Sequence, residues 1–335
     1  MSDLFAALPD DARRRLRPAP PPDWVPPMLA TLTNRRFSDP AWLFERKLDG
    51  ERCFGYRRGG EIRLLSRDRK RVDGAYPEVA EALGREAETD LVVDGEIVAF
   101  EDGQTSFARL QRRTQIRDRE EVRRSDVAVF YYVFDLLHLA GHDTTDLPLR
   151  LRKALLRRAV TYREPLRYSV HRNTDGEAFD QEACGRGWEG VVAKKADSLY
   201  VGRRSPDWLK FKCTNQQEVV VGGFTEPAGS RVGFGALLIG FYSGRDLVFA
   251  GKVGTGYDVE TLLDLRRRLE ALRQDDPPFV GVRARQPGVH WVRPEVVAQV
   301  AFTEWTEDGK LRHPRFLGLR RDKDPGEVVR EAPVR

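Results

Sequence analysis

The feature that most restricts the possible folds is an apolar run from Val127 to Leu137, in which Asp135 is the only charged residue. Its eleven residues are too few to cross a membrane, because a spanning helix takes about 20 apolar residues. A run of this length and composition is typical of a central strand that is covered on both faces. The run therefore predicts a sheet buried by other layers of the fold.

Shorter segments on both sides of this run predict the rest of the first half of the chain. Segments rich in strand formers stand at 42–46, 53–56, 62–66, 91–100, 168–171, 190–194 and 208–212. Apolar residues recur at helical spacing at 77–85, 106–113, 149–162 and 175–184, with Gly84 and Gly185 as the expected ends of two of these helices. The stretch Arg57-Arg58-Gly59-Gly60 separates two alternating segments, which is typical of a hairpin turn.

The character of the chain changes near residues 214–216. Beyond this point strands are predicted at 218–224, 236–242, 247–253 and 296–305, with one helix at 258–272 and a turn at Asp308-Gly309. Short strands, many glycines and a single helix are typical of a small barrel of the oligonucleotide-binding (OB) type. We therefore predict an α+β protein with a lead-in at 1–24, a domain of antiparallel sheets with flanking helices at 25–214, and an all-β OB domain at 215–330.

Composition excludes several classes of protein. The N-terminus lacks the apolar core of a signal peptide and no apolar run reaches transmembrane length, so we expect a cytoplasmic protein without a membrane partner. The net charge of +5 permits a polyanionic partner. Cys53, Cys184 and Cys213 form no C-x-x-C pair and no zinc spacing, so we expect three small buried residues, no disulfide and no structural zinc.

Lys47 begins the stretch Lys-Leu-Asp-Gly-Glu-Arg, which we interpret as the reactive centre. A lysine amine becomes a nucleophile when it loses its proton near neutral pH, and burial or neighbouring positive charge favours that loss. Lys210 and Lys212, two residues apart on a predicted strand, point to one face and could aim at a phosphate and at Lys47. Taken alone, Lys-x-Asp-Gly is more often an exposed turn with a solvated charge.

Further segments follow in order, and the ordered set resembles the ATP-dependent DNA ligases of the covalent nucleotidyltransferase superfamily. These segments are Ser66-Arg67-Asp68, Val93-Asp94-Gly95-Glu96-Ile97, Val133-Phe134-Asp135, Glu189 to Lys194, Trp208 to Lys212 and Phe316 to Lys323. The chain is most similar to the bacterial ligases of nonhomologous end joining, either as their ligase module or as a stand-alone enzyme. The resemblance extends from residue 27 to residue 325.

This resemblance implies a chemistry in three steps. Neutral Lys47 attacks the α-phosphate of ATP, pyrophosphate leaves, and AMP stays on the amine as a phosphoramide. AMP then passes to the 5′-phosphate at a DNA break, and the 3′-hydroxyl displaces AMP and seals the strand. Each step is an in-line displacement at phosphorus, so the protein positions the reactants and neutralises their charge.

The resemblance also assigns residues to the nucleotide. Glu45 would accept a hydrogen bond from the adenine amino group, Phe134 would stack on adenine, and Arg52 would bind ribose or the terminal DNA phosphate. Lys194, Lys210 and Lys212 complete the nucleotide site, and the last two would neutralise the α-phosphate. From residue types alone, Phe134 is equally well explained as a core residue. Lys210 and Lys212 could be a solvated strand edge, although Trp208 and Phe211 alternate with them, which indicates that one face is buried.

Two carboxylates and the terminal segment receive further roles from the resemblance. Glu96 and Glu189 would hold Mg²⁺ or Mn²⁺, since these cations prefer carboxylate and phosphate oxygens; a buried ion pair is the alternative. Arg320, Asp322 and Lys323 would orient the leaving pyrophosphate during lysine adenylation. The second domain would then swing away about a hinge at 213–217.

The implied partner is nicked or broken double-stranded DNA, bound by a monomer, with a DNA-end-binding Ku protein as a recruiting partner. Arg67 would contact a DNA phosphate. Arg109, Arg112 and Arg113 lie on one predicted helix, where phosphate contacts and simple surface solvation explain them about equally.

Three other functions remain open from the sequence. An RNA-capping guanylyltransferase shares the lysine nucleophile and the two-domain plan, but the segments at 94–100 and 106–113 look like those of DNA ligases. An RNA ligase is disfavoured by Arg320-x-Asp-Lys323. A non-catalytic nucleic-acid-binding protein would explain the barrel and the basic charge, but not the spacing of Lys47, Glu96 and Glu189.

Overall fold

The computed structural model describes residues 3–114, 116, 118–284 and 286–332. Tertiary contacts divide the chain into two units, with the division between Cys213 and Thr214. Within the described residues, no helix is both long and apolar enough to span a membrane. The first unit contains helices and sheets, and the second unit is mostly β. The predicted α+β fold class is therefore confirmed.

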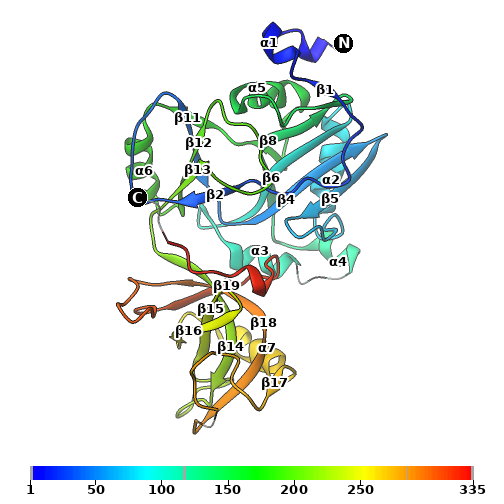
Figure 1. The fold of residues 1–335 in the computed structure, drawn as a ribbon. Helices are drawn as coiled ribbons and strands as arrows, with labels where there is room; N and C mark the ends of the chain where they lie inside the picture. Colours follow the sequence, from blue (N-terminus) through cyan, green and yellow to red (C-terminus); the bar gives the residue numbers. More distant parts are fainter. Residues whose placement is uncertain (1–2, 115, 117, 285, 333–335) are drawn as a thin grey trace. The chain divides into compact units, whose positions relative to one another are not determined.

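The first unit contains two sheets (Figure 1). The first sheet has the order β1 (Arg17–Pro18), β9 (His142–Asp143), β8 (Val129–Leu139), β6 (Leu91–Glu101), β4 (Glu51–Arg58) and β5 (Glu61–Ser66), with β7 (Gln104–Thr105) beside β6 and β10 (Leu166–Tyr168) beside β8. The second has the order β11 (His171–Asn173), β3 (Trp42–Lys47), β12 (Gly190–Lys195), β13 (Arg204–Lys212) and β2 (Leu29–Leu32). The apolar run is β8, inside the first sheet, so the predicted central strand is confirmed.

Helices cover the sheets where their apolar faces require burial. α2 (Pro77–Glu86), α3 (Phe107–Thr114) and α5 (Leu149–Ala159) contribute to the same apolar core as β8, while α6 (Gly176–Gly185) packs on β12 of the second sheet. The shorter helices are η1 (Asp3–Phe5), α1 (Asp10–Arg13) and α4 (Arg119–Arg124). Gly84 does not end α2 as predicted, and Gly185 is the last residue of α6. A Cβ at Gly84 would stand 3.2 Å from Ile62, so the glycine permits close packing on β5.

The predicted strand at 168–171 is wrong, because this segment belongs to two sheets. Leu166–Tyr168 pairs in parallel with β8, whereas His171–Asn173 pairs with β3 in the other sheet. Ser169 and Val170 connect the two. A single short apolar pattern cannot reveal such a crossing, because the partner of each strand is chosen by tertiary contacts.

The described part of the predicted lead-in packs into the first unit; residues 1–2 lie outside the described residues. Phe5, Leu8, Ala12 and Leu16 are buried in the core that also holds β8. A further apolar cluster brings residues of both sheets together, including Phe54, Val92, Phe134 and Trp208. Two of the predicted site residues, Arg52 and Lys194, lie over aromatic rings of this cluster.

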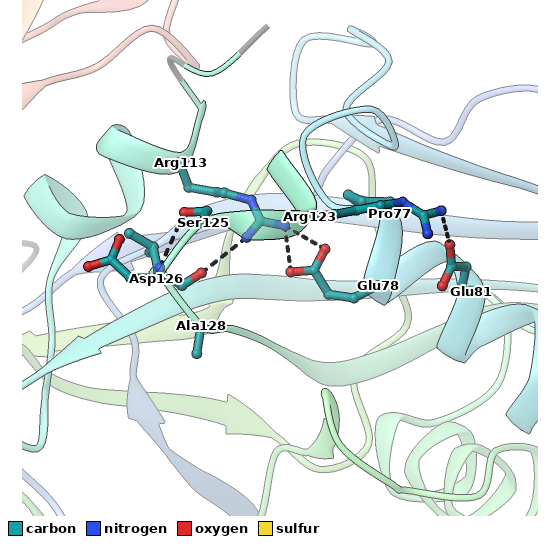
Figure 2. Close-up of a pocket in the computed structure, with 9 residues that line it drawn as sticks. Pro77, Glu78, Glu81, Arg113, Arg123, Ser125, Asp126 and Ala128 are labelled. Atoms are coloured by element: carbon teal, nitrogen blue, oxygen red, sulfur yellow. Dashed lines mark hydrogen bonds and ion pairs between the residues drawn. The ribbon is translucent and has the colours of Figure 1, made fainter. Parts of the chain in front are cut away.

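A polar hollow of about 240 Å³ lies beside α2 and α3, and Arg113 occupies one wall of it (Figure 2). Arg113 is 3% exposed and donates two hydrogen bonds to Glu78, at 2.6 and 2.7 Å. It also donates to the carbonyl oxygens of Ala75 and Val127. Arg113 therefore joins α3 to α2 as a structural residue, which removes it from the three arginines considered as phosphate contacts.

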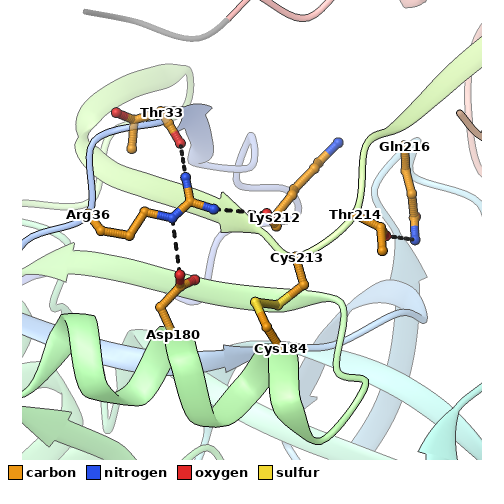
Figure 3. The surroundings of a disulfide bond; sticks show 8 residues. All are labelled: Thr33, Arg36, Asp180, Cys184, Lys212, Cys213, Thr214 and Gln216. Atoms are coloured by element: carbon orange, nitrogen blue, oxygen red, sulfur yellow. Dashed lines mark hydrogen bonds and ion pairs between the residues drawn. A yellow bond between two sulfur atoms is a disulfide. The ribbon is translucent and has the colours of Figure 1, made fainter. Parts of the chain in front are cut away.

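Cys184 and Cys213 form a disulfide, with their Cα atoms 5.1 Å apart (Figure 3). The prediction of three unpaired buried cysteines is therefore wrong; Cys53 is free and buried. The two bonded residues are separated by 29 positions and belong to no spacing motif, so the sequence carries no signal for the pair. They meet because α6 packs on β12 and β13 is the next strand of that sheet, which brings the last turn of α6 to the end of β13.

Arg36 ties the same region together next to the disulfide (Figure 3). Its Nε donates to Asp180 of α6 at 3.1 Å, and its Nη2 donates to the carbonyl of Lys212 at 2.9 Å. Asp180 lies close to both sulfur atoms, but those atoms bond to each other. The end of β13 is thus attached to α6 by one covalent bond and one arginine bridge.

The second unit is a mostly β structure of OB-like type (Figure 1). Its strand order is β16 (Asp246–Val253), β15 (Leu237–Ser243), β14 (Gln216–Thr225), β18 (Val289–Ala301) and β17 (Arg273–Gln274), with β19 (Arg315–Leu319) beside β18. α7 (Val259–Glu270) buries Leu262, Leu265 and Leu269 against this sheet, and η2 (Pro325–Glu327) follows β19. The strand predicted at 296–305 starts earlier and ends earlier, because β18 pairs first with β17 and then with β19.

Candidate active site

Lys47 is the last residue of β3, and two neighbouring strands continue its row across the sheet. Lys47 pairs with Gly190 of β12, and Gly190 pairs with Lys212 of β13. Residues paired across antiparallel strands point to the same face. Adjacent strands lie about 4.8 Å apart, so the two lysine Cα atoms are about 10 Å apart and their long side chains can reach one ligand.

The next row carries two more of the predicted residues on the same face. Glu45 pairs with Val192, and Val192 pairs with Lys210. The structure therefore brings four predicted residues, from segments far apart in the sequence, to one face: Glu45, Lys47, Lys210 and Lys212.

Gly190 is the residue that makes the first row possible. Its φ is +149°, a conformation that side chains of L-residues rarely adopt, and a Cβ here would stand 1.9 Å from the carbonyl oxygen of Phe211. The glycine lets β13 approach β12 closely and leaves the space between Lys47 and Lys212 without a side chain. Gly190 is part of a motif in the sequence, but the sequence does not show why a glycine is needed at this position.

Lys47 makes its closest described contact with a carboxylate. Its Nζ lies 2.6 Å from Oε1 of Glu189, and its side chain is 20% exposed. Burial lowers the pKa of Lys47, but the charges of Glu189, Asp49 and Glu96 outweigh it, so the pKa lies above its ordinary value. The described charges around Lys47 are therefore negative, and they shift its pKa in the direction opposite to that expected from burial and positive neighbours.

Glu189 and Glu96 are suitable ligands for a divalent cation. The second oxygen of Glu189, Oε2, is buried and has no hydrogen-bond partner among the described residues. Glu96 lies on β6, and its charge acts on Lys47. An orphaned carboxylate oxygen next to a second carboxylate fits a hard cation such as Mg²⁺. The alternative of a simple ion pair with Lys47 uses only one of the two oxygens of Glu189.

Glu45 sits at the centre of a buried polar cluster. Its Oε1 accepts from Lys153 at 2.6 Å, and its Oε2 accepts from Lys194 and from the Ser169 hydroxyl, both at 2.9 Å. Burial would raise the pKa of Glu45, but the charges of Lys153 and Lys194 lower it to about 2. Sequence reasoning missed Lys153 and Ser169. Lys153 lies on α5 and Ser169 lies in the connection between β10 and β11, and the sequence does not show how these segments pack against β3. A carboxylate can accept about four hydrogen bonds, so one remains for a ligand.

Arg52 is held by a partner that sequence reasoning did not assign. Its Nε and Nη2 donate to the two oxygens of Asp94, at 2.6 and 2.5 Å, and Tyr200 donates to the same carboxylate at 2.7 Å. The Arg52 guanidinium lies 4.8 Å from the ring centroid of Phe134. Asp94 therefore fixes the orientation of Arg52 beside the predicted adenine-stacking residue.

Phe134 is buried at 8% exposure, and cations lie over its ring. The Nζ of Lys194 is 4.0 Å from the ring centroid, and Trp208 contacts the ring edge-on at 6.0 Å. Burial lowers the pKa of Lys194, and the charge of Lys153 lowers it further, against the opposing effect of Glu45. The structure thus brings Phe134 and Lys194 together at the border of the apolar cluster between the sheets.

The remaining predicted residues are Arg67 in the first unit and the terminal segment in the second. Arg67 is in the turn after β5. In the second unit, Arg320 donates to both oxygens of Asp322, at 2.9 and 2.7 Å, and Lys323 pairs with Glu218 at 2.9 Å. Burial would raise the pKa of Asp322, but Arg320 lowers it below the ordinary value. The terminal segment therefore presents an arginine whose orientation its own aspartate fixes.

Comparison with known proteins gives matches along most of the chain. Residues 27–212 match a family model described as the ATP dependent DNA ligase domain, and residues 230–323 match the ATP dependent DNA ligase C terminal region. The solved structure of mycobacterial DNA ligase D complexed with ATP and MES aligns with a TM-score of 0.65 and 37% identity, covering 92% of this chain and 98% of that chain.

Two curated relatives are multifunctional proteins of bacteria. The multifunctional non-homologous end joining protein LigD of Pseudomonas aeruginosa is 38% identical over 323 residues, which are 94% of this chain and 38% of that protein. The multifunctional non-homologous end joining DNA repair protein LigD of Mycobacterium tuberculosis is 38% identical over 317 residues, which are 92% of this chain and 40% of that protein. The chain therefore spans about two fifths of the length of these relatives.

Proposed function

The chain belongs to the ATP-dependent DNA ligases, and from this membership we propose that it seals 3′-hydroxyl/5′-phosphate breaks in double-stranded DNA through a lysyl-AMP and a DNA-adenylate. The observation that carries the proposal is the row Lys47–Gly190–Lys212, with Glu189 at 2.6 Å from the Lys47 amine. A nucleophile, an anion-binding cation and a carboxylate on one sheet face are the parts that phosphoryl transfer requires.

Lys47 is the nucleophile in this proposal. Its Nζ forms a bond to the α-phosphorus of ATP as the bond to the β-phosphate oxygen breaks and pyrophosphate leaves. Glu189 Oε1, at 2.6 Å, is placed to take the proton that the ammonium must first lose. Glu189 and Glu96 would hold Mg²⁺ or Mn²⁺, whose charge would neutralise these carboxylates and lower the pKa of the lysine. Lys212 and Lys210 stabilise charge on the α-phosphate.

Glu45, Arg52 and Phe134 orient the nucleoside in this proposal. Phe134 stacks on adenine, and the remaining lone pair of Glu45 accepts from the adenine amino group, which selects ATP over GTP. Arg52, already fixed by Asp94, contacts ribose or the DNA 5′-phosphate. In the second unit, Arg320, oriented by Asp322, binds the leaving pyrophosphate together with Lys323.

Covalent labelling tests the proposed chemistry. The protein is incubated with α-phosphate-labelled ATP or GTP and a divalent cation, then separated on a denaturing gel, beside Lys47→Ala and the control Lys195→Ala, an exposed lysine of β12. We expect an ATP-specific band that Lys47→Ala abolishes and Lys195→Ala keeps. Lys47→Ala should still seal a pre-adenylated nick, because that displacement does not use the amine.

Other labelling results identify the competing functions. A GTP-specific band favours the capping guanylyltransferase. If no band forms even after pyrophosphate has removed any bound AMP, the chain is a binding protein without this chemistry. A band that forms but discharges onto RNA ends instead of nicked DNA favours an RNA ligase.

We further propose that the chain acts as a monomer in bacterial end joining with a DNA-end-binding Ku protein. The support is the end-joining role in the names of both curated relatives. Joining of linear DNA is measured with and without a Ku protein. An increase for broken ends but not for a single nick supports recruitment at ends, and equal rates in both reactions contradict it.

A further inference from the structure

Arg46 is a cationic residue that the proposed chemistry does not use. It lies on β3 between Glu45 and Lys47, so its side chain leaves the opposite face of the strand, since successive side chains alternate. Its Nε and Nη2 atoms are buried, and neither has a hydrogen-bond partner among the described residues. Buried arginines are normally paired. The side chain as a whole is only half-buried, so part of it remains open to a ligand.

Aromatic rings and further arginines surround Arg46. Its guanidinium carbon lies 4.4 Å from the ring centroid of Trp188 and 5.8 Å from that of Phe100. Arg186 lies over Trp188 at 5.4 Å, and Arg167 lies over Phe100 at 5.9 Å. We name Arg46, Phe100, Arg167, Arg186 and Trp188 the arginine–aromatic cluster. It joins residues from β3, β6 and β10 and from the connection between α6 and β12.

The cluster continues along the neighbouring strand β8. Arg167 lies 3.9 Å from the ring centroid of Phe130 and donates to the Tyr132 hydroxyl at 2.9 Å. Phe100, Phe130 and Trp188 are each half-buried. Their exposed parts provide apolar surface next to the guanidinium groups, a combination that suits sugars and bases as well as phosphates.

The charges of the cluster are not balanced by its own acidic partners. Arg167 pairs with Glu164 at 2.5 Å and Arg186 pairs with Glu182 at 2.8 Å, whereas no ion pair of Arg46 is present among the described residues. Burial lowers the pKa of Arg46, and the charge of Arg186 adds to this effect against that of Tyr132. Arg46 therefore adds a positive charge that no acidic residue among the described residues pairs with.

We propose that the arginine–aromatic cluster binds a phosphodiester of the DNA substrate. The proposal rests on the proposed ligase function. A guanidinium fork fits a phosphate, and the opposite orientation of Arg46 on β3 separates this contact from the nucleotide site.

The salt dependence of DNA binding tests the proposal. Binding of a fluorescent nicked duplex by the full chain is measured over a series of salt concentrations for wild type, Arg46→Met, Arg46→Lys and Arg186→Met. Arg150→Met is the matched control, because Arg150 is a half-exposed, ion-paired arginine of the same unit. Each lost phosphate contact reduces the slope of log affinity against log salt by about 0.9. We expect Arg46→Met to reduce the slope by this amount, with several-fold weaker binding at low salt.

The other variants make the result decisive. Arg46→Lys should restore most of the slope, Arg186→Met should reduce it, and Arg150→Met should leave it unchanged. Equal slopes for wild type, Arg46→Met and Arg186→Met overturn the proposal. If Arg46→Met does not fold, the slope of Arg186→Met tests the proposal, because Arg186 is exposed. Labelling of Lys47 by ATP is measured separately, without DNA. If wild type gives no labelled band, the ligase chemistry is rejected. If labelling is normal but the salt slopes are unchanged, only this DNA contact is rejected.

Discussion

At the scale of single residues, Glu45 is the anion that makes two buried lysines tolerable. Its Oε1 and Oε2 accept from Lys153 and Lys194, whose side chains are 2% and 3% exposed. Breaking a buried pair by removing one partner costs about 3 to 5 kcal/mol. We expect Glu45→Gln to lower the free energy of unfolding of the first unit by this amount, measured by urea denaturation at pH 7. Glu164→Gln, at an exposed pair, is the control and should cost less than about 1 kcal/mol.

The same carboxylate predicts how stability depends on pH. The folded-state pKa of Glu45 is about 2, below its ordinary value of 4.5, so its contribution is fully present above pH 4.5 and is lost as pH falls toward 2. The shift corresponds to roughly 3 kcal/mol. Wild type should therefore lose more stability than Glu45→Gln between pH 5 and pH 3. Parallel pH profiles for the two proteins would contradict this role.

Glu189 controls the protonation of the nucleophile, and this can be measured without turnover. The Lys47 pKa is raised in the ligand-free protein, chiefly by Glu189 against the effect of burial. Glu189→Gln should lower that pKa and enlarge the neutral fraction of the amine. We expect faster acylation of Lys47 by an N-hydroxysuccinimide ester at pH 8, by up to about tenfold per unit of pKa. Lys195, quantified by mass spectrometry in the same digest, is the internal control; an unchanged ratio of the two lysines would refute the pairing.

At the scale of secondary-structure elements, the contact of β12 with β13 depends on Gly190. Gly190→Ala would combine a φ of +149° with a Cβ 1.9 Å from the Phe211 carbonyl oxygen. We expect a loss of roughly 2 to 6 kcal/mol in unfolding free energy, together with slower adenylation of Lys47. Gly59→Ala separates the cost of the backbone conformation from the cost of the steric clash. Its φ is +57° and nothing lies within 4 Å of the added Cβ, so that change should cost only about 1 to 2 kcal/mol.

The disulfide stabilises the attachment of α6 to the end of β13. It closes a loop between residues 29 positions apart, and chain-entropy estimates give such a bond roughly 3 to 4 kcal/mol. We expect Cys184→Ser to lower the unfolding free energy of the oxidised protein by this amount. Reductant should bring wild type to the level of the variant and leave the variant unchanged. Insensitivity of wild type to reductant would show that the bond does not stabilise this unit.

At the scale of the whole molecule, the two units are expected to divide the chemical steps. The residues of the first unit are proposed to act in every step, whereas Arg320 of the second unit is proposed to act on pyrophosphate only. Arg320→Ala should slow lysine adenylation by about 100-fold more than sealing of a pre-adenylated nick. Arg312→Ala is the matched control, because Arg312 is an exposed, ion-paired arginine of the same unit. An equal loss in both assays would indicate a folding defect instead.

The elements and the order of the motifs were readable from the amino-acid sequence. The apolar run that became β8, the Gly59-Gly60 hairpin and the helical spacing of α2 and α7 follow from local periodicity and turn chemistry, which depend on near neighbours in the chain. The nucleophile motif and its companion segments were recognisable for the same reason, since each is a short contiguous pattern. These signals were sufficient for the fold class and the family.

Contacts between distant segments required the tertiary structure. No local pattern connects the residues of three important contacts. These are the Cys184–Cys213 bond, the pairing of Arg52 with Asp94 and the hydrogen bond from Lys153 to Glu45. The charge state of Lys47 also needed the fold, because a pKa depends on the balance of burial and nearby charge, and both are properties of packing. Periodicity along a chain specifies which face of an element is buried, whereas the identity of the neighbour across that face is decided only when the elements pack together.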